Sequence, residues 1–270
     1  MNKKKKKKNS ETTNLETIII NNTVINNTTT EILPLLPPGN DSMVHIADIT
    51  DDFSHTMEPI LRMYSAAMSA TTARLEIIED EFKYRNLRKP IHHIDTRLKS
   101  AKSILGKLEK KNLDLTLSAA CNNIYDIAGI RVVCPYIKDV YLIRDRLIAQ
   151  DDLRIMEIKD YIEEPKPNGY RSLHMIIRIP VYFMNKKQYV PVELQIRTLA
   201  MDLWASLEHD IKYKSLYTDA QPINTFSEAG ETIDNAILED MDLEAELKEC
   251  SQLIYEAEAK MERMNRFLEN

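Results

Sequence analysis

The chain has 270 residues, 43% of them hydrophobic and 29% charged, which is an ordinary composition for a folded globular protein. Its net charge of −6 argues against a general nucleic-acid coat protein, because such proteins are basic overall. The three cysteines are widely spaced and form no CxxC pair, so they suggest neither a disulfide framework nor a zinc site. No apolar run approaches the roughly 18 residues of a membrane span. We therefore expect a cytoplasmic protein with no membrane association.

Residues 1–50 are predicted to be a disordered, low-complexity leader. Lysines come first, and an Asn- and Thr-rich stretch and a Pro-rich stretch follow, so this segment can bury little apolar surface. The basic start is not followed by the continuous apolar segment of a signal peptide. The leader is expected to be a solvated tail, or else a weak contact site for an anionic partner.

The spacing of apolar residues predicts two helices over 53–88 and 95–111, followed by an α/β unit. Within that unit we expect strands and helices to alternate in the following order: strand 129–135, helix 137–150, strands 154–161, 172–180 and 188–197, and helix 199–214. The fold class is therefore α/β (or α+β), with a mixed sheet flanked by helices and with long helices at both ends.

The tail, from about 227 to 268, contains no proline and carries apolar residues at alternating spacings of three and four. Its seam consists of Leu247, Cys250, Ile254, Ala257, Met261, Met264 and Leu268. Such a heptad seam could pack against the chain's own first helix or form a contact between subunits. The sequence leaves both alternatives open.

A first polar cluster lies within residues 97–107. If this segment is one helix, three cations and a hydroxyl share a stripe that suits a polyphosphate, although a basic stripe can also be a plain solvated face. The members of this cluster are Arg97, Lys99, Ser103 and Lys107.

Two carboxylates stand at strand positions. Asp126 comes just before Gly129 and its strand, where a carboxylate can hold Mg²⁺ or simply cap a turn. Glu193 shares a strand face with Gln195 and Arg197, while the apolar neighbours point to the other face. We expect Asp126 and Glu193 to meet across the sheet, an arrangement that suits phosphoryl-type transfer.

A Pro-Asn-Gly turn within residues 166–174 is dense in functional side chains. Tyr170 could stack on a purine, and Lys166, Arg171 and His174 could meet phosphates or ribose hydroxyls. A purely structural turn would not require such a collection, although it remains the alternative.

Together these clusters resemble the synthetase domain of the RelA/SpoT homologue family, and specifically its small single-domain alarmone synthetases. The similarity runs from about Phe53 to Lys214. The specific stretches are Arg97–Leu108, Tyr125–Arg131, Asp160–His174 and Val192–Lys214. The resemblance implies a nucleotidyltransferase-like mixed sheet. It also implies synthesis of the alarmone (p)ppGpp, by transfer of pyrophosphate from ATP to the 3′-hydroxyl of GDP or GTP with release of AMP.

The resemblance also implies roles for individual residues. Asp126 would bind Mg²⁺, and Glu193 would assist the metal or draw the proton from the 3′-hydroxyl. The residues expected to bind ATP are Arg97, Lys99, Ser103, Lys107 and Arg131, with the two arginines on either side of the adenine. The residues expected to bind the acceptor nucleotide are Lys166, Tyr170, His174, Gln195 and Asp202, with Tyr170 stacked on the guanine.

The chain departs from the family pattern at Thr96 and Ser100, where relatives often have Gly and Pro, and at Asp202, where they often have Asn. We expect a synthetase domain over 51–215 and a helical extension over 216–270 that forms a homo-oligomer, a tetramer by resemblance. His92, His93, Asp95 and the His209–Asp210 pair lack a ligand set, so no hydrolase activity is expected. The rival functions are another nucleotidyltransferase of this fold and a single-stranded RNA-binding module, and RNA binding could also accompany synthesis.

Overall fold

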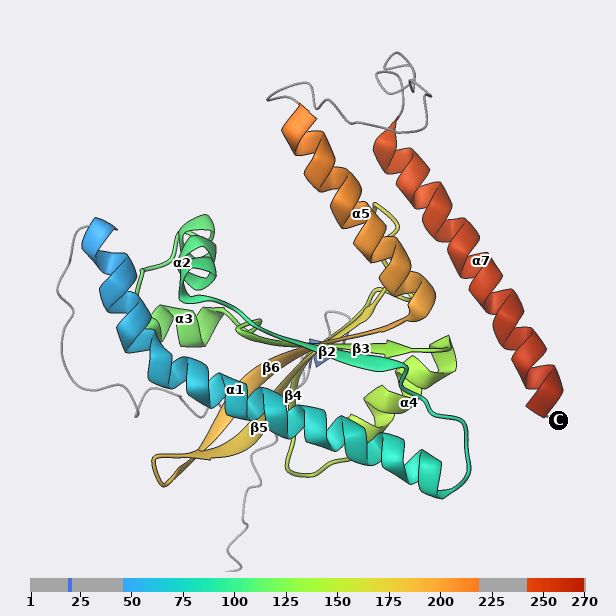
Figure 1. Cartoon of the computed structure of the whole chain (residues 1–270), viewed down its shortest axis with the longest axis horizontal. Coiled ribbons are helices and arrows are strands. Elements are labelled where there is room, and N and C mark those ends of the chain that lie inside the picture. Colours follow the sequence, from blue (N-terminus) through green and yellow to red (C-terminus); the bar gives the residue numbers. More distant parts are fainter. Residues whose placement is uncertain (1–18, 21–45, 219–241, 270) are drawn as a thin grey trace, which may run out of the picture.

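The computed structural model describes residues 19–20, 46–218 and 242–269 (Figure 1). Most of the predicted leader and residues 219–241 of the tail lie outside this range. The described helices are α1 (Ile46–Tyr84), α2 (Ala101–Lys110), α3 (Leu117–Asn123), α4 (Ile137–Ile148), α5 (Leu199–Thr218) and α7 (Leu243–Glu269). The strands are β1 (Ile19–Ile20), β2 (His93–Leu98), β3 (Ala128–Cys134), β4 (Arg154–Asp160), β5 (Leu173–Phe183) and β6 (Lys186–Thr198).

The strands form one mixed sheet in the order β1-β4-β5-β6-β3-β2. β3 runs parallel to β6, β1 runs parallel to β4, and the other neighbours are antiparallel. β5 and β6 form a hairpin whose two turn residues, Met184 and Asn185, both have positive φ angles. This is the backbone conformation that lets a two-residue turn follow the twist of the strands.

The core lies between one face of the sheet and the helices α1 and α4 (Figure 1). Alternate residues of β5 and β6 are buried on this face, as strand geometry requires. They are Leu173, Met175, Ile177 and Ile179 of β5 and Val190, Val192, Leu194 and Ile196 of β6. Figure 1 shows α5 and α7 on the opposite side of the sheet from α1. Because the apolar side chains of β5 and β6 point toward α1, the side chains that alternate with them lie on the other face of the sheet.

Most of the α/β order predicted from the sequence is confirmed. The four predicted strands correspond to β3, β4, β5 and β6, and the helices predicted over 137–150 and 199–214 correspond to α4 and α5. The long first helix is also present, although it covers Ile46–Tyr84 rather than 53–88. Short α3 and the two edge strands, β1 and β2, were not predicted.

The single helix predicted over 95–111 is wrong. Residues 93–98 form β2, which hydrogen-bonds along β3, and α2 begins only after Ser100. Ser100 has extended backbone angles and its hydroxyl accepts a hydrogen bond from the Ser103 N–H, so it caps α2. Arg97 therefore lies on a strand and Lys99 on the connection, while Ser103 and Lys107 lie on the helix. The four residues do not share one helical stripe.

Helix α7 packs mainly against α5 and not, as one alternative proposed, against the first helix. Its buried residues are Leu247, Ser251, Glu258 and Glu262. Of the predicted seam, Leu247 is buried, whereas Met261 and Met264 are 48% and 55% exposed. The three-and-four spacing marked an apolar stripe, but α5 and the 166–171 turn contact α7 along a rotated face that shares only part of this stripe, including Leu247.

No described helix is both long and apolar enough to cross a membrane.

Candidate active site

The register of the sheet gathers polar side chains on the face away from α1. His174, Gln195, Arg131 and Asp95 occupy adjacent positions across β5, β6, β3 and β2. Two residues further along these strands, Glu193, Gly129 and Arg97 form a second such row. Because Gly129 carries no side chain, space is left between Glu193 and Arg97.

A cavity of about 370 Å³ opens over these two rows. Its lining residues are Asp95, Arg97, Lys99, Asp126, Gly129, Ile130, Arg131, Glu193 and Gln195. Three cations and three carboxylates therefore face one space, which suits a highly charged ligand that binds together with a cation.

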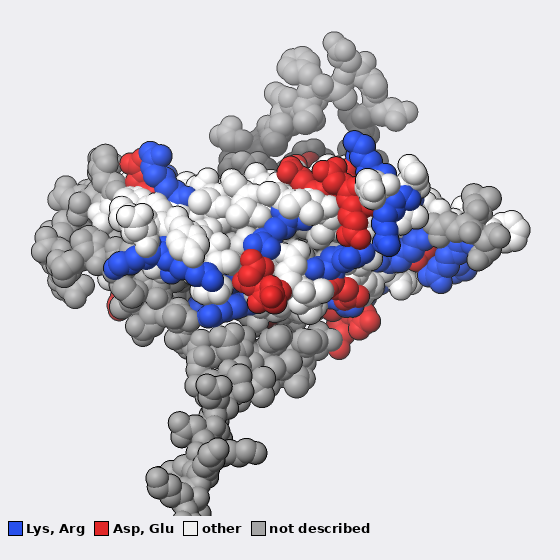
Figure 2. Space-filling model, turned by 90° about the horizontal axis from the view of Figure 1, so that it is seen from below, with Lys and Arg blue, Asp and Glu red and all other residues white. Residues whose placement is uncertain are grey.

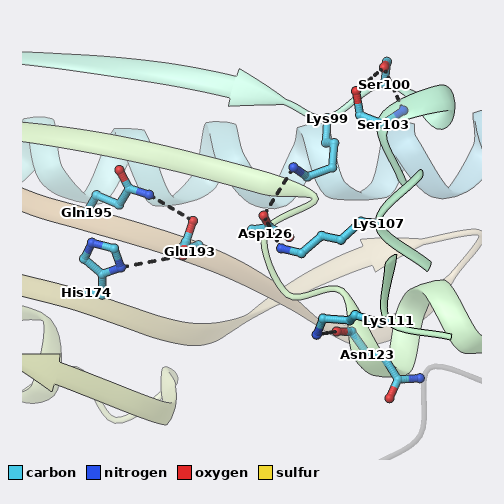
Figure 3. A network of polar contacts seen from close by, with 10 residues as sticks. All are labelled: Lys99, Ser100, Ser103, Lys107, Lys111, Asn123, Asp126, His174, Glu193 and Gln195. Carbon is cyan, nitrogen blue, oxygen red and sulfur yellow. Dashed lines mark hydrogen bonds and ion pairs between the residues drawn. The ribbon is translucent and has the colours of Figure 1, made fainter. Parts of the chain in front are cut away.

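Asp126 is held by two lysines (Figure 3). Its Oδ2 atom lies 2.6 Å from Lys107 Nζ and 3.2 Å from Lys99 Nζ. Burial alone would raise the pKa of this carboxyl, but the hydrogen bond and charge of Lys107, together with Lys99, outweigh burial and lower it. Asp126 is therefore ionised at neutral pH. Its Oδ1 atom is buried and has no hydrogen-bond partner.

The pKa of Glu193 is shifted in the opposite direction. Burial raises it, and the negative charge of Asp126 raises it further. A hydrogen bond from Gln195 Nε2 to Glu193 Oε2, at 3.3 Å, opposes this shift only in part. Two carboxyl groups at one site thus differ in proton affinity, which is the pattern expected when one stays charged and the other exchanges a proton.

A group of aromatic and basic side chains adjoins Glu193 on β5 and on the preceding turn. His174 Nδ1 lies 3.9 Å from Glu193 Oε1, and its Nε2 atom lies 2.9 Å from the Tyr170 hydroxyl. Burial lowers the pKa of His174 to about 3, so the imidazole is neutral and its contact with Glu193 is not a charged pair. Lys166 Nζ lies 4.6 Å from the centre of the Tyr170 ring and 4.7 Å from that of Tyr161.

Asp202, at the start of α5, connects two arginines. Its Oδ1 atom lies 2.9 Å from Arg197 Nη2 and 3.6 Å from Arg131 Nη1. Burial lowers the pKa of Arg197, whose side chain is only 4% exposed. Asp202 thus neutralises a buried guanidinium and joins the predicted ATP side of the cavity to the predicted acceptor side.

The structure brings most of the predicted site residues together. The residues that line the cavity include Arg97, Lys99, Asp126, Arg131, Glu193 and Gln195. His174 contacts Glu193, Tyr170 contacts His174, and Lys166 contacts Tyr170. Lys107 contacts Asp126, and Asp202 contacts Arg131, and both Asp126 and Arg131 line the cavity. Ser103 is not among the described residues that line the cavity. Its hydroxyl lies 2.9 Å from that of Ser100 at the first turn of α2.

Three residues near the site were not predicted from the sequence as site residues. Tyr161 packs edge-to-face on His174, Arg197 holds Asp202, and Trp204 lies beside Tyr170. Trp204 is the only tryptophan of the chain and follows Asp202 by two residues, which was an available signal. For Arg197 the strand alternation with Glu193 and Gln195 was the available signal, whereas for Tyr161 only the fold shows that it approaches the site.

The carboxylate oxygens of Asp126 and Glu193 form a set that a hard divalent cation could use. The unpartnered Oδ1 atom of Asp126 is the clearest sign, because a buried carboxylate oxygen without a partner is costly. Among the described residues, His, Cys, Asp and Glu side chains do not gather in groups of three or more that could enclose a metal.

Comparison with protein families shows that residues 96–217 match a model described as a region found in RelA / SpoT proteins. The match begins within β2 and ends on α5, so it includes every residue that lines the cavity except Asp95.

Two curated proteins of Bacillus subtilis (strain 168) are similar to the chain. It is 43% identical to GTP pyrophosphokinase YwaC over 173 residues, which are 64% of this chain and 82% of that protein. It is 34% identical to GTP pyrophosphokinase YjbM over 157 residues, which are 58% of this chain and 73% of that protein.

Solved structures agree with this result. The small alarmone synthetase 2 of Bacillus subtilis is 38% identical, with a TM-score of 0.60, over 76% of this chain and 96% of that one. The small alarmone synthetase 1 of Bacillus subtilis, bound to its product pppGpp, is 26% identical, with a TM-score of 0.63, over 82% of this chain and 100% of that one.

Proposed function

The chain belongs to the RelA/SpoT family, and from that premise we propose that it is a GTP pyrophosphokinase that makes the alarmone (p)ppGpp. The reaction transfers the β,γ-pyrophosphate of ATP to the 3′-hydroxyl of GDP or GTP and releases AMP. The observation that carries this proposal is the pair of carboxyl groups, Asp126 and Glu193, that face one cation-lined cavity with opposite pKa shifts.

Glu193 would accept the proton of the attacking 3′-hydroxyl. A general base works best with a proton affinity higher than that of an ordinary exposed carboxylate. Burial and the charge of Asp126 raise the pKa of Glu193, and its direct contacts are the Gln195 amide and the neutral His174. The hydrogen bond from Gln195 to Oε2 fixes the orientation of the carboxylate.

Asp126 and Glu193 would together hold Mg²⁺, which supplies positive charge to the phosphates when it is bound. Lys99 and Lys107 keep Asp126 ionised and are themselves available to the phosphates. Ser103 and the first turn of α2 would add N–H groups and a hydroxyl, because a helix N-terminus favours anions. Phosphoryl-type transfer depends mainly on such positioning and charge neutralisation.

Arg97 and Arg131 would bind the adenine of ATP between them. Arg97 pairs with Gly129 across β2 and β3, so Arg131, two residues along β3, is its diagonal neighbour. Diagonal side chains of adjacent strands begin about 7–8 Å apart. This separation leaves room for a planar base between two guanidinium groups, which also attract aromatic faces.

The acceptor nucleotide would bind on the opposite side of Glu193. Tyr170 would stack on the guanine, and Lys166, His174 and Gln195 would contact the nucleotide. The chain of contacts from Tyr170 through His174 to Glu193 supports this placement, because it brings the acceptor beside the proposed base. Asp202 would contribute to guanine binding while it remains paired with Arg197 and Arg131.

We further propose that the protein is a homo-oligomer, a tetramer by resemblance, that residues 51–215 form the synthetase domain, and that the protein acts in the cytoplasm. The outward face of α7 supports self-association, since Leu253, Met261, Met264 and Phe267 are largely exposed. Unpaired apolar side chains at helical spacing commonly mark a protein interface.

On the face drawn in Figure 2, Lys and Arg lie among Asp and Glu rather than in a continuous basic stripe. Binding of single-stranded RNA alongside synthesis stays a prediction.

The experiment that tests the proposed function incubates the protein with Mg²⁺, ATP and either GDP or GTP, and separates the nucleotides by chromatography. Equal amounts of AMP and of a guanosine 3′-pyrophosphate product are expected, and the rates with GDP and GTP would identify the preferred acceptor. Absence of both products would refute the proposal.

A further inference from the structure

The turn that carries the acceptor-binding residues is held from outside by the two helices on its side of the sheet. Within the turn, the Gly169 N–H donates to the Lys166 carbonyl at 2.8 Å, and the Lys166 N–H donates to the Tyr170 carbonyl at 3.2 Å. These two bonds close the turn but do not attach it to the rest of the protein. Tyr170 bonds to His174 of β5, and Arg171 Nη1 donates to the Ile162 carbonyl at 3.0 Å. Further contacts come from α5 and α7.

Ser251 makes the most direct contact. This buried residue of α7 donates its hydroxyl to the Gly169 carbonyl oxygen at 2.5 Å. Gly169 has a φ angle of +89°, which favours glycine. A Cβ atom at Gly169 would lie 2.7 Å from Ser251 Cβ and 3.2 Å from Lys248 Cα, so α7 lies directly against the backbone of the turn.

Contacts on both sides of Gly169 continue this attachment. Arg171 Nη2 donates to Gln252 Oε1 at 3.3 Å, and its guanidinium carbon lies 4.2 Å from the centre of the Tyr255 ring. From α5, Glu208 accepts a hydrogen bond from Asn168 Nδ2 at 3.1 Å.

Trp204 of α5 connects the two helices and the turn. Its indole N–H donates to the Leu247 carbonyl of α7 at 2.9 Å, and its ring lies 6.4 Å from the Tyr170 ring. Leu247 is one turn before Ser251 along α7. The helix is therefore fixed on α5 at the point where it meets the acceptor turn.

We propose that Ser251 is a positioning residue for the acceptor site, through which the docked helix α7 holds the 166–171 turn in its nucleotide-binding conformation. The proposal rests on the proposed function, since it assumes that this turn binds the guanine nucleotide. The residues expected to bind ATP lie on β2, on its connection to α2, on α2 and on β3, and Figure 1 shows α2 at the far end of the sheet from α7. Loss of the Ser251 contact therefore weakens acceptor binding and leaves ATP binding unchanged.

The test compares Ser251→Ala with the wild-type protein in steady-state kinetics, with each substrate varied in turn. Loss of one buried hydrogen bond is expected to raise the KM for the guanine nucleotide roughly tenfold. The KM for ATP and kcat should stay within about twofold of the wild-type values, because Ser251 touches neither the ATP residues nor the reacting groups. Lys260→Ala, at an exposed position of the same helix, is the matched control and should change none of these constants.

Amide hydrogen exchange provides a second measurement that does not depend on turnover. In Ser251→Ala the amides of residues 168–171 should exchange faster than in the wild type, while those of β3 and β6 keep their rates. An unchanged KM for the guanine nucleotide with unchanged exchange at the turn would overturn the proposal. An equal rise of both KM values with a lower Tm would also overturn it, because it would show a general loss of structure.

Failure of the proposed function is distinguishable from failure of this inference. If the wild-type protein makes no guanosine 3′-pyrophosphate, the function is wrong. In that case the exchange rates alone decide whether Ser251 holds the turn.

Discussion

Asp126 and Glu193 face the same cavity, yet their pKa values are shifted in opposite directions. The difference arises from their neighbours. Asp126 has two lysine partners, whereas Glu193 has an amide, a neutral imidazole and the charge of Asp126 itself. The division of labour proposed for the two carboxyl groups follows from this asymmetry.

Replacing either carboxyl group by its amide should abolish most of the turnover. We expect Glu193→Gln to lower kcat by roughly 10²- to 10⁴-fold, the usual contribution of a positioned acid–base group, and Asp126→Asn to lower it by a similar factor because the amide cannot hold Mg²⁺ as a carboxylate does. Both variants should keep the far-UV circular dichroism spectrum of the wild type. Glu109→Gln, at an exposed position on α2, is the control and should keep full activity. Near-normal turnover in either site variant would contradict the assignment.

The Tyr170 ring and its hydroxyl should have separate effects. Tyr170→Ala removes the ring proposed to stack on guanine, so the KM for GDP or GTP should rise about tenfold or more while that for ATP changes little. Tyr170→Phe keeps the ring and loses only the hydroxyl contact with His174, so its effect should be smaller. Initial rates with each substrate varied would measure both. An equal effect on the two KM values would place Tyr170 outside the acceptor site.

Arg97 should matter for ATP and not for the acceptor. We expect Arg97→Ala to raise the KM for ATP about fivefold or more, because a guanidinium stacked on a base contributes on the order of 1 kcal/mol. Arg97→Lys should not restore the wild-type value, since an ammonium group has no planar face. Direct binding of a non-hydrolysable ATP analogue, measured by calorimetry, checks the effect without turnover. Normal binding in Arg97→Ala would contradict the proposed adenine site.

Glu258 should make the protein less stable as the pH rises. Burial, together with the charge of Glu262, raises its pKa from 4.5 to about 7 in the folded state. The folded state therefore holds this proton more tightly than the unfolded state, and stability is lost as the pH rises from about 4.5 to 7. The loss is on the order of 3 kcal/mol.

Glu258→Gln removes this titration. Urea unfolding at pH 8 should show the variant to be more stable than the wild type, and the difference should shrink at pH 5. Glu249→Gln, at an exposed position of α7, should follow the wild-type curve at both values. A constant difference between Glu258→Gln and the wild type at the two pH values would contradict this account.

The sequence predicted the α/β centre well because its signals are local. Alternation along 188–197 placed Glu193, Gln195 and Arg197 on one face, and the register of β6 with β3 and β5 confirms it. The Pro-Asn-Gly signal likewise predicted the turn at Gly169.

The parts that could not be predicted depend on contacts distant in sequence. Residues 93–98 form a strand because β3 is available to pair with them, and this pairing does not show in their own pattern. The apolar spacing on α7 could not reveal that Trp204 would bind the Leu247 carbonyl and that Gly169 would bind Ser251, which lies outside the seam. Nor could spacing show that the same Asp202 holds both Arg131 and Arg197.

The most direct test of the central claim follows the phosphorus atoms of ATP into the products. ATP labelled at either the α or the β phosphorus is incubated with Mg²⁺, the protein and GDP or GTP. The account predicts that the β label appears in the guanosine product and the α label in AMP. Appearance of the α label in the guanosine product, with release of free pyrophosphate, would show nucleotidyl transfer and contradict it.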